Sequence, residues 1–337
     1  MESFWKSQLD YVFFVYGLSF ILFGYVCFSI RRLEYGALPW TTLAYFGFIH
    51  GTCEWLDLLA ISLGDNSIFS LVRLLLKALS FILLFVFCLR TSSYNATARN
   101  IPLIVAALIV VLLTAITSPL SYAAVDDMVR WSLALPGCLW ASLLIYRAAV
   151  VDFGRRRTLL LVISGAFACY GLLAGATVPN SEIVTGWMPS HNAFLAIVGV
   201  PVQVFRALFA TIAAAVLWGY EIEITLSETT ASAMRQGFRR TLITLLAVST
   251  VGWAVTYFLG MVDTGISGRR LIGICSCLII SLQIMLHYAE VKRRFNIEID
   301  LREKHRELEY LIGHLERMRS ETPKEKDVAE VYIRSNA

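Results

Sequence analysis

Nine long apolar segments, separated by short polar breaks, decide what this chain can fold into. A helix needs roughly 20 residues to cross a hydrocarbon core of about 30 Å, and each segment is close to that length. Turn-forming residues occupy the breaks, as in Gly64-Asp65-Asn66. We therefore expect an all-α integral membrane protein with about nine transmembrane helices, arranged as seven plus two. The expected spans are residues 11–30, 38–63, 67–90, 101–118, 128–148, 158–177, 193–220, 241–260 and 271–290.

The composition agrees with a chain that lies in lipid. Of the 337 residues, 57% are hydrophobic and 16% are charged, whereas soluble domains carry about 25% charged residues. The formal net charge is only +4, and most basic residues flank apolar segments instead of forming one patch. We therefore expect the apolar surface of the helices to contact the lipid bilayer, and we expect no binding of nucleic acid.

Basic residues follow every second expected span. They occur at Arg31-Arg32, Arg90, Arg155-Arg156-Arg157, Arg239-Arg240 and Lys292-Arg293-Arg294, and the connections on the other side hold few of them. Loops rich in Lys and Arg stay on the cytoplasmic side of a membrane. The pattern predicts an N-terminus outside the membrane and a C-terminus in the cytoplasm.

The expected spans divide the chain into five parts. A seven-span membrane body (residues 1–220) precedes a cytoplasmic connector (221–240) and two further transmembrane helices (241–290). Residues 291–320 are expected to form a helix that leaves the membrane, and residues 321–337 a disordered tail.

Apolar residues recur at heptad positions a and d of the helix that leaves the membrane. They are Leu301, Leu308, Leu311 and Leu315, although Lys304 occupies one d position. We expect a parallel two-stranded coiled coil in the cytoplasm and hence a homodimer. A seam of about three heptads is marginal alone, so a single solvated helix stays open as the alternative.

The second expected span carries a polar stripe made of His50, Glu54 and Asp57. Positions i, i+4 and i+7 share one helix face, and a charged group costs roughly 2.5–3.5 kcal/mol at a bilayer centre unless it is paired or wet. The third span supplies a base at the same depth, because Asp57 and Arg73 each lie eight residues from Asp65 in the turn.

The same counting from the turn pairs Glu54 with Lys77 and His50 with Ser80. One interpretation is that these residues form internal salt bridges that pin the hairpin. The other is that they line a ligand, proton or ion site that opens outward, since ionisable residues within a membrane are commonly functional. The residues alone favour neither interpretation clearly.

The seventh expected span contains a second polar group, Pro201-Val-Gln203-Val-Phe-Arg206. Pro201 is expected to kink the helix, because it removes a backbone donor. Arg206 lies about 14 residues, or roughly 21 Å, from the outer end. We therefore expect it to join a shared cluster through Glu54 or Asp57, with inward snorkelling as the alternative.

The ninth expected span places Gln283, His287 and Glu290 on one face near the inner side. They fit a hydrated interfacial ladder or, alternatively, a relay into the coiled coil. His287 and the more outward His50 are poorly placed to ligate one haem iron, so we predict neither haem, another cofactor nor a metal. No nucleophile–base arrangement or phosphate-binding loop is recognisable, so we expect no catalytic domain in this chain.

The motifs His50-Gly-x-x-Glu54-Trp55-x-Asp57 and Pro201-x-Gln203-x-x-Arg206 precede a last span that runs into a charged helix. Together they resemble the N-terminal membrane sensor regions of bacterial sensor histidine kinases and related diguanylate cyclases. The resemblance implies a sensor of a two-component system in a bacterial inner membrane. Such a sensor relays a small ligand, or a membrane or proton stimulus, to a cytoplasmic kinase or cyclase output domain or partner. The chain ends where that output domain is expected to begin.

Two sets of residues carry this hypothesis. The candidates for sensing are His50, Glu54, Trp55, Asp57, Arg73, Lys77, Gln203 and Arg206. The candidates for signal relay are Pro201, Gln283, His287, Glu290, Leu301, Leu308, Leu311 and Leu315. A proton- or ion-coupled transporter or channel that uses the same charges is the alternative function, although the sequence has no recognisable inverted repeat.

Overall fold

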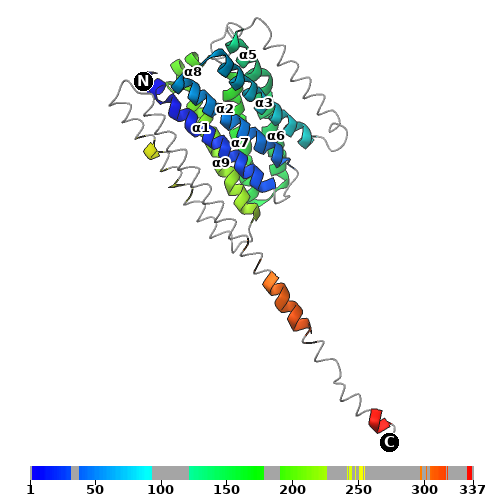
Figure 1. Ribbon diagram of the computed structural model, residues 1–337. Coiled ribbons are helices and arrows are strands. Elements are labelled where there is room, and N and C mark those ends of the chain that lie inside the picture. The colour runs from blue at the N-terminus through cyan, green and yellow to red at the C-terminus, as the bar shows by residue number, and fades with distance from the viewer. Residues whose placement is uncertain are drawn as a thin grey trace. The chain divides into compact units, whose positions relative to one another are not determined.

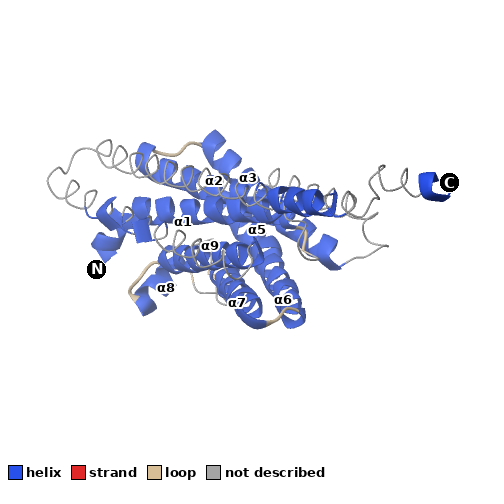
Figure 2. Cartoon of the chain, turned by 90° about the horizontal axis from the view of Figure 1, so that it is seen from below, coloured by secondary structure: helices blue, strands red, loops and turns tan. Residues whose placement is uncertain are grey.

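The computed structural model describes four long stretches of the chain, and their elements are all helices (Figures 1 and 2). The stretches are residues 2–31, 38–92, 121–177 and 190–225, and scattered positions between 241 and 335 are described as well. The helices are α1 (Glu2–Arg31), α2 (Trp40–Leu63), α3 (Ser67–Ser92), α5 (Tyr122–Val129), the π-helix η1 (Arg130–Ala134), α6 (Leu135–Val151), α7 (Gly154–Ala176), α8 (His191–Val198) and α9 (Val202–Thr225).

Five of the described helical stretches are long and apolar enough to cross a membrane, which supports a multi-pass membrane protein. They are Gln8–Arg31, Ser67–Ser92, Tyr122–Val151, Gly154–Gly175 and Val202–Ile224. The helix α2 is not among them, because His50, Glu54 and Asp57 lower its mean hydropathy. The expected span at 101–118, the span at 271–290 and most of that at 241–260 lie outside the described residues.

The described helices α1, α2, α3, α6, α7 and α9 pack side by side (Figure 1), and their contacts close into a ring. Each contacts the next in the order α1, α2, α3, α6, α7, α9, and α9 returns to α1. Hydrogen bonds also join neighbouring helices of the ring, for example between the Ser19 hydroxyl of α1 and the Thr211 hydroxyl of α9 (2.8 Å). The described helices therefore surround the interior of the ring laterally.

One end of this ring, the pocket end, collects the polar residues described below. The turn between α2 and α3 lies there, and the start of α5 lies beside the start of α3, because the Tyr122 hydroxyl donates to the Ser67 carbonyl (3.3 Å). The end of α7 and the start of α9 meet there as well, through Arg206 and Thr177. The other end of these helices, with the α6–α7 turn and the end of α9, is called the opposite end.

Glycines allow two pairs of helices to approach very closely. A methyl group on Gly47 of α2 would lie 2.8 Å from the Gly24 Cα atom of α1, so neither helix tolerates a side chain there. In α7, a methyl group on Gly171 would meet Cys138, and one on Gly175 would meet Leu135 at 2.4 Å. The Gly171-Leu-Leu-Ala-Gly175 segment thus serves helix packing, as small residues do in membranes.

The expected seventh span is wrong as one continuous helix. It is divided into α8 and α9, because Gly199 adopts a left-handed conformation (φ 75°) and Pro201 follows it. Pro201 therefore precedes a helix instead of kinking one, which agrees with its missing N–H. The helix α9 continues to Thr225, so the expected connector begins as a helical extension.

The fifth expected span starts earlier than the sequence pattern indicated. The helix begins at Tyr122, where the Ser121 hydroxyl accepts a hydrogen bond from the Ala124 amide (3.3 Å) as an N-terminal cap. It then passes through the five-residue π-helix η1. The earlier start brings Asp126 into the helix at the pocket end.

The C-terminal residues 280–337 form a compact unit of their own. Within it, residues 304–315 are helical, and Leu308, Leu311 and Leu315 are all more than half exposed. Leu301 is helical and exposed too. The relay candidates Gln283, His287 and Glu290, and most of the expected disordered tail, lie outside the described residues.

Candidate functional site

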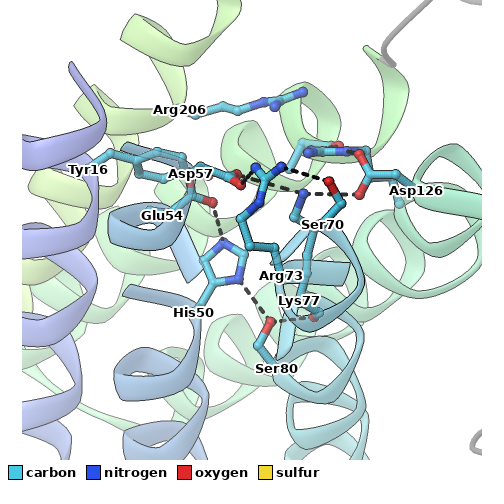
Figure 3. Close-up of polar contacts among 12 residues, drawn as sticks. Tyr16, His50, Glu54, Asp57, Ser70, Arg73, Lys77, Ser80, Asp126 and Arg206 are labelled. Carbon is cyan, nitrogen blue, oxygen red and sulfur yellow. Dashed lines mark hydrogen bonds and ion pairs between the residues drawn. The ribbon is translucent and has the colours of Figure 1, made fainter. Parts of the chain in front are cut away.

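Six charged side chains form a chain of alternating sign at the pocket end (Figure 3). Arg73 Nη1 donates to Asp57 Oδ1 (2.5 Å), and the same guanidinium binds Asp65 in the α2–α3 turn. Lys77 Nζ donates to Asp126 Oδ1 (3.0 Å) and lies 3.8 Å from Asp57 Oδ2. The order of the charged chain is Asp65, Arg73, Asp57, Lys77, Asp126 and Arg130, the last pair joined at 2.8 Å.

A pocket of about 250 Å³ opens among these charges. Its walls come from the end of α2, the first half of α3 and the start of α5. Asp57, Arg73 and Lys77 line the inside, and the exposed Asp65 and Tyr122 lie at the mouth. The pocket is therefore open to the outside near the α2–α3 turn.

His50 lies deeper in the ring, is 1% exposed and connects four helices. Its Nδ1 atom lies 2.9 Å from the Ser80 hydroxyl of α3, and its Nε2 atom lies 2.7 Å from the Tyr170 hydroxyl of α7. Tyr170 is in turn 2.7 Å from the Tyr16 hydroxyl of α1. Rings of Phe20, Phe46 and Phe81 enclose the imidazole, with centroids 4.6–5.4 Å away. We call these four hydrogen-bonded residues, together with Glu54, the histidine hub.

The hydrogen bonds of the histidine hub restrict where its protons lie. The Ser80 hydroxyl donates to the Lys77 carbonyl (2.6 Å), so it accepts from His50 Nδ1–H. The other ring nitrogen, Nε2, faces both the Tyr170 hydroxyl and Glu54 Oε1, the latter at 3.4 Å. A neutral imidazole accepts from Tyr170 there, whereas an imidazolium donates to the Glu54 carboxylate. The same heavy-atom positions thus fit two proton arrangements.

Arg206 is 3% exposed and binds the C-terminal end of α7 instead of an acid. Its Nε and Nη2 atoms donate to the Leu173 carbonyl (3.0 and 2.7 Å), and Nη2 donates to the Thr177 carbonyl (2.8 Å) and hydroxyl (2.9 Å). These carbonyls form the negative end of the helix dipole. Arg130 donates to the neighbouring Ala174 carbonyl (3.4 Å), so two guanidinium groups converge on one helix end.

His191 at the start of α8 completes the surroundings of Arg206. Its Nε2 atom lies 3.4 Å from Arg206 Nη2. Burial, and then the positive charge of Arg206, hold the pKa of the His191 imidazole well below its usual range. The neutral ring offers a lone pair to the guanidinium without adding a second positive charge.

Two of the three pairs expected from counting along the hairpin are confirmed. Asp57 binds Arg73, and His50 binds Ser80. The expected Glu54–Lys77 pair is wrong: Lys77 turns to Asp126, and Glu54 faces His50. The reason is that α5 brings a second acid to Lys77, which the hairpin alone cannot reveal.

The expected contact of Arg206 with Glu54 or Asp57 is wrong as well. Neither acid forms an ion pair with Arg206 in the part of the chain that the structure describes, and Figure 3 draws no contact between them. The end of α7 supplies enough carbonyl acceptors to satisfy the guanidinium. Charge on Arg206 is therefore balanced by backbone dipoles.

Two other sensing candidates lie apart from the pocket. Trp55 Nε1 donates to the Phe14 carbonyl of α1 (3.2 Å), and its ring lies over Gly17, so this side chain packs α2 on α1. Gln203 is half-buried in the first turn of α9 and does not line the pocket. Both residues belong to the motifs behind the family resemblance, but neither touches the charged chain.

The charged chain and the histidine hub contain five residues that were not among the predicted site residues: Tyr16, Tyr170, Asp65, Asp126 and Arg130. Asp126 and Arg130 had a signal, because opposite charges four residues apart inside an apolar stretch pair on one helix face. The tyrosines had none, since a hydroxyl that points into a helical bundle looks in sequence like a membrane-interface tyrosine.

Nothing in the described residues points to a metal. In those parts of the chain, no three His, Cys, Asp or Glu side chains come together as a metal site would require. Comparisons with protein-family models, with curated proteins and with solved structures found no match.

Proposed function

We propose that this chain is a non-enzymatic, membrane-embedded sensor of a bacterial inner membrane, in which the charged pocket perceives the stimulus. The stimulus is a small ligand or a change in the membrane or proton gradient. The single observation that carries the proposal is that an open pocket lined by acids and bases lies directly above a buried hub that ties four helices together. Bacterial sensor histidine kinases and diguanylate cyclases, which the motifs resemble, need such a coupling.

The first step of signal transfer runs from the pocket into α2 and α3. Asp57 belongs to α2, and Arg73 and Lys77 belong to α3, so any group that enters the pocket changes the forces between these two helices. Lys77 also carries the carbonyl that fixes the Ser80 hydroxyl, three residues further along α3. A displacement of Lys77 is thus passed directly to the hydrogen bond between Ser80 and His50.

The second step runs from His50 to the helices that lead onward. Tyr170 and Tyr16 connect the imidazole to α7 and α1, and Arg206 connects the end of α7 to α9. The chain then continues from α9 toward the C-terminus. The break at Gly199 and Pro201 separates α8 from α9, so α9 can shift without carrying α8 as one rigid rod.

The output step uses the C-terminal helix. Its exposed Leu308, Leu311 and Leu315 fit one seam, and we infer that two chains pair along it as a parallel coiled coil in the cytoplasm. From the distribution of basic residues we infer nine spans with an outer N-terminus, which would put this helix in the cytoplasm. A cytoplasmic kinase or cyclase output domain, or a separate partner, would receive the signal.

Such a sensor works only if the stimulus prefers one of two states. A ligand that binds both states equally well shifts neither. The two proton arrangements of the histidine hub provide two such states, which differ in whether Glu54 and His50 are both neutral or both charged. A stimulus that changes the electrostatic field that Lys77 or Asp57 exerts on the hub favours one of these two protonation states.

A fusion protein tests this proposal. The full chain is joined after the C-terminal helix to a diguanylate cyclase domain, and the product is measured in cells together with the amount of inserted protein. We expect Arg73→Gln and His50→Gln to change the output at least several-fold at unchanged insertion. The matched control is Asp152→Asn, which removes an acid at the opposite end. Equal output from all four chains would contradict a sensor function.

A proton-coupled transporter is the second candidate, because Glu54, His50, Tyr170 and Tyr16 form a continuous polar line into the ring. Purified chain in sealed vesicles with a pH-sensitive dye inside would decide between the two functions. Proton or substrate flux that Glu54→Gln abolishes would favour transport. Absence of flux, combined with an altered fusion output, would favour sensing.

A further inference from the structure

The links in the charged chain are unequal, and the inequality separates two groups of opposite charge. Every other link is a hydrogen bond of 3.0 Å or shorter, but Lys77 Nζ lies 3.8 Å from Asp57 Oδ2 and makes no hydrogen bond to it. On one side of this gap, Asp57 and Asp65 share Arg73, which leaves a net charge of −1. On the other side, Lys77 and Arg130 share Asp126, which leaves a net charge of +1.

Both atoms at the gap have unused hydrogen-bonding capacity. Asp57 Oδ2 accepts no hydrogen bond from any residue that the structure describes. Lys77 Nζ carries three N–H donors and uses one of them on Asp126. Both side chains line the pocket. The pocket thus presents a free acceptor on its negative side and free donors on its positive side, a few ångströms apart.

We propose that the pocket binds a small zwitterion whose ammonium group binds Asp57 and whose anionic group binds Lys77. This inference rests on the proposed function, because it names the chemistry of the ligand that the sensor perceives. A primary ammonium group has three donors for Asp57 Oδ2 and its surroundings, and a carboxylate or phosphate accepts from Lys77. The ligand replaces the weak 3.8 Å link with two charge-assisted hydrogen bonds.

Ligands with a single charge fit this pocket less well. The six charges of the charged chain sum to zero, so a simple cation or anion adds an unbalanced charge to a partly buried site. A zwitterion adds none and aligns its dipole with the two groups. The volume of about 250 Å³ lies below the 300–1,000 Å³ typical of sites for drug-sized molecules, which indicates a ligand as small as an amino acid or a headgroup.

Binding in the gap also explains how the ligand acts on the helices. Asp57 is on α2, whereas Lys77 is on α3 and is held by Asp126 of α5. A group inserted between them moves α2 away from α3 and α5. Because the same stretch of α3 carries Ser80, this movement changes the hydrogen bond to His50.

The zwitterion has two possible sources, a free amino acid or the headgroup of phosphatidylethanolamine, and one experiment separates them. Purified full chain is placed in nanodiscs of phosphatidylglycerol with phosphatidylcholine, whose quaternary ammonium has no N–H donor. The unfolding midpoint is measured with 10 mM alanine or 4-aminobutyrate, and with ethylamine and propionate, which are alanine without its carboxylate and without its ammonium. A second set of nanodiscs replaces phosphatidylcholine with phosphatidylethanolamine.

We expect a zwitterion to raise the midpoint by about 2–4 °C, whereas ethylamine and propionate leave it within about 1 °C. The shift should disappear in Asp57→Asn and in Lys77→Gln and persist in the opposite-end control Asp152→Asn. A shift with amino acids identifies a free ligand, and a shift only with phosphatidylethanolamine identifies the headgroup. If neither zwitterion shifts the wild-type chain, or if a single-charge analogue shifts it equally, the proposal is overturned, even where a variant fails to fold.

Zwitterion binding and the sensor function can fail independently, and the two experiments distinguish these failures. If no zwitterion binds but Arg73→Gln still changes the cyclase output of the fusion, the pocket senses something else. If a zwitterion binds and the output ignores both the ligand and the pocket variants, the binding site stands and the sensor function does not.

Discussion

The two ends of the helical ring use the same kinds of charged residue in different settings. At the opposite end, Arg155 lies 3.8 Å from Glu223 and Arg156 lies 3.6 Å from Asp152. Both arginines are more than one-third exposed, whereas the acids Glu223 and Asp152 are only 25% and 15% exposed, so the contrast lies in the basic partners. At the pocket end, Lys77 and Arg130 bind Asp126 at 3.0 and 2.8 Å, and all three side chains are at least four-fifths buried.

The difference shows which charges the fold depends on. An exposed ion pair contributes about 0–1 kcal/mol, because water screens it and both side chains lose freedom. Burying an ion pair costs the desolvation free energy of both charges. Removing one partner then destabilises the fold by several kcal/mol, because the other charge stays buried without compensation. The charges at the pocket end are therefore the ones whose removal should cost the fold most.

The largest expected effect comes from removing the acid that two bases share. Asp126→Asn leaves Lys77 and Arg130 with one neutral partner in a shielded site, so we expect a loss of about 3–5 kcal/mol in the free energy of unfolding. Asp152→Asn at the opposite end should cost about 0–1 kcal/mol. Chemical unfolding of both variants in the same detergent measures the contrast. Equal losses would mean that the pocket-end charges are screened like surface charges.

A smaller effect is expected from changing the shape of one buried cation. Arg206→Lys keeps the charge but loses the planar fork that reaches the Leu173 and Thr177 carbonyls together, so we expect a loss of about 1.5–3 kcal/mol. Arg155→Lys is the matched exchange at the opposite end and should change stability by less than about 0.5 kcal/mol. Thermal unfolding followed by tryptophan fluorescence measures both. An unchanged unfolding temperature of Arg206→Lys would show that α7 does not depend on the hydrogen bonds from Arg206 to its C-terminal carbonyls.

The smallest effect is expected from glycine-to-alanine substitutions, which test whether packing, in addition to charge, distinguishes the two ends. A methyl group on Gly175 meets the Leu135 backbone and side chain within 3 Å, so Gly175→Ala should cost about 1–3 kcal/mol. Gly219→Ala toward the opposite end meets only Leu159 at 3.8 Å, and Gly165→Ala in α7 meets nothing within 4 Å. Both controls should be neutral in the same unfolding assay. Comparable costs at all three positions would remove close packing as an explanation.

Counting along the sequence succeeded where one hairpin fixes the geometry. Two antiparallel helices joined by a short turn place residues at equal distance from the turn at equal depth, which gave Asp57–Arg73 and His50–Ser80. The same method failed for Lys77 and Arg206, because their partners come from helices whose neighbours in the ring no local pattern reveals. The order of the helices around the ring is a tertiary property.

The helix boundaries show a similar division. The ends of α2 and α3 agree with the expected spans within about two residues, because apolar length and turn residues define them locally. The break between α8 and α9 was missed although Gly199 and Pro201 are both visible in the sequence. Within one long apolar run, a proline alone predicts a kink. Here the left-handed Gly199, two residues before Pro201, ends α8, and α9 starts directly after the proline.

Nitrogen NMR of the histidine rings tests whether the charged pocket and the histidine hub form one connected unit. The full chain is labelled at its histidine ring nitrogens, and wild type is compared with Arg73→Gln in nanodiscs. We predict that the His50 ring-nitrogen resonances shift, while those of His305 and His314 in the C-terminal helix stay in place. Unchanged His50 resonances in the Arg73→Gln variant would show that the pocket and the hub are not connected.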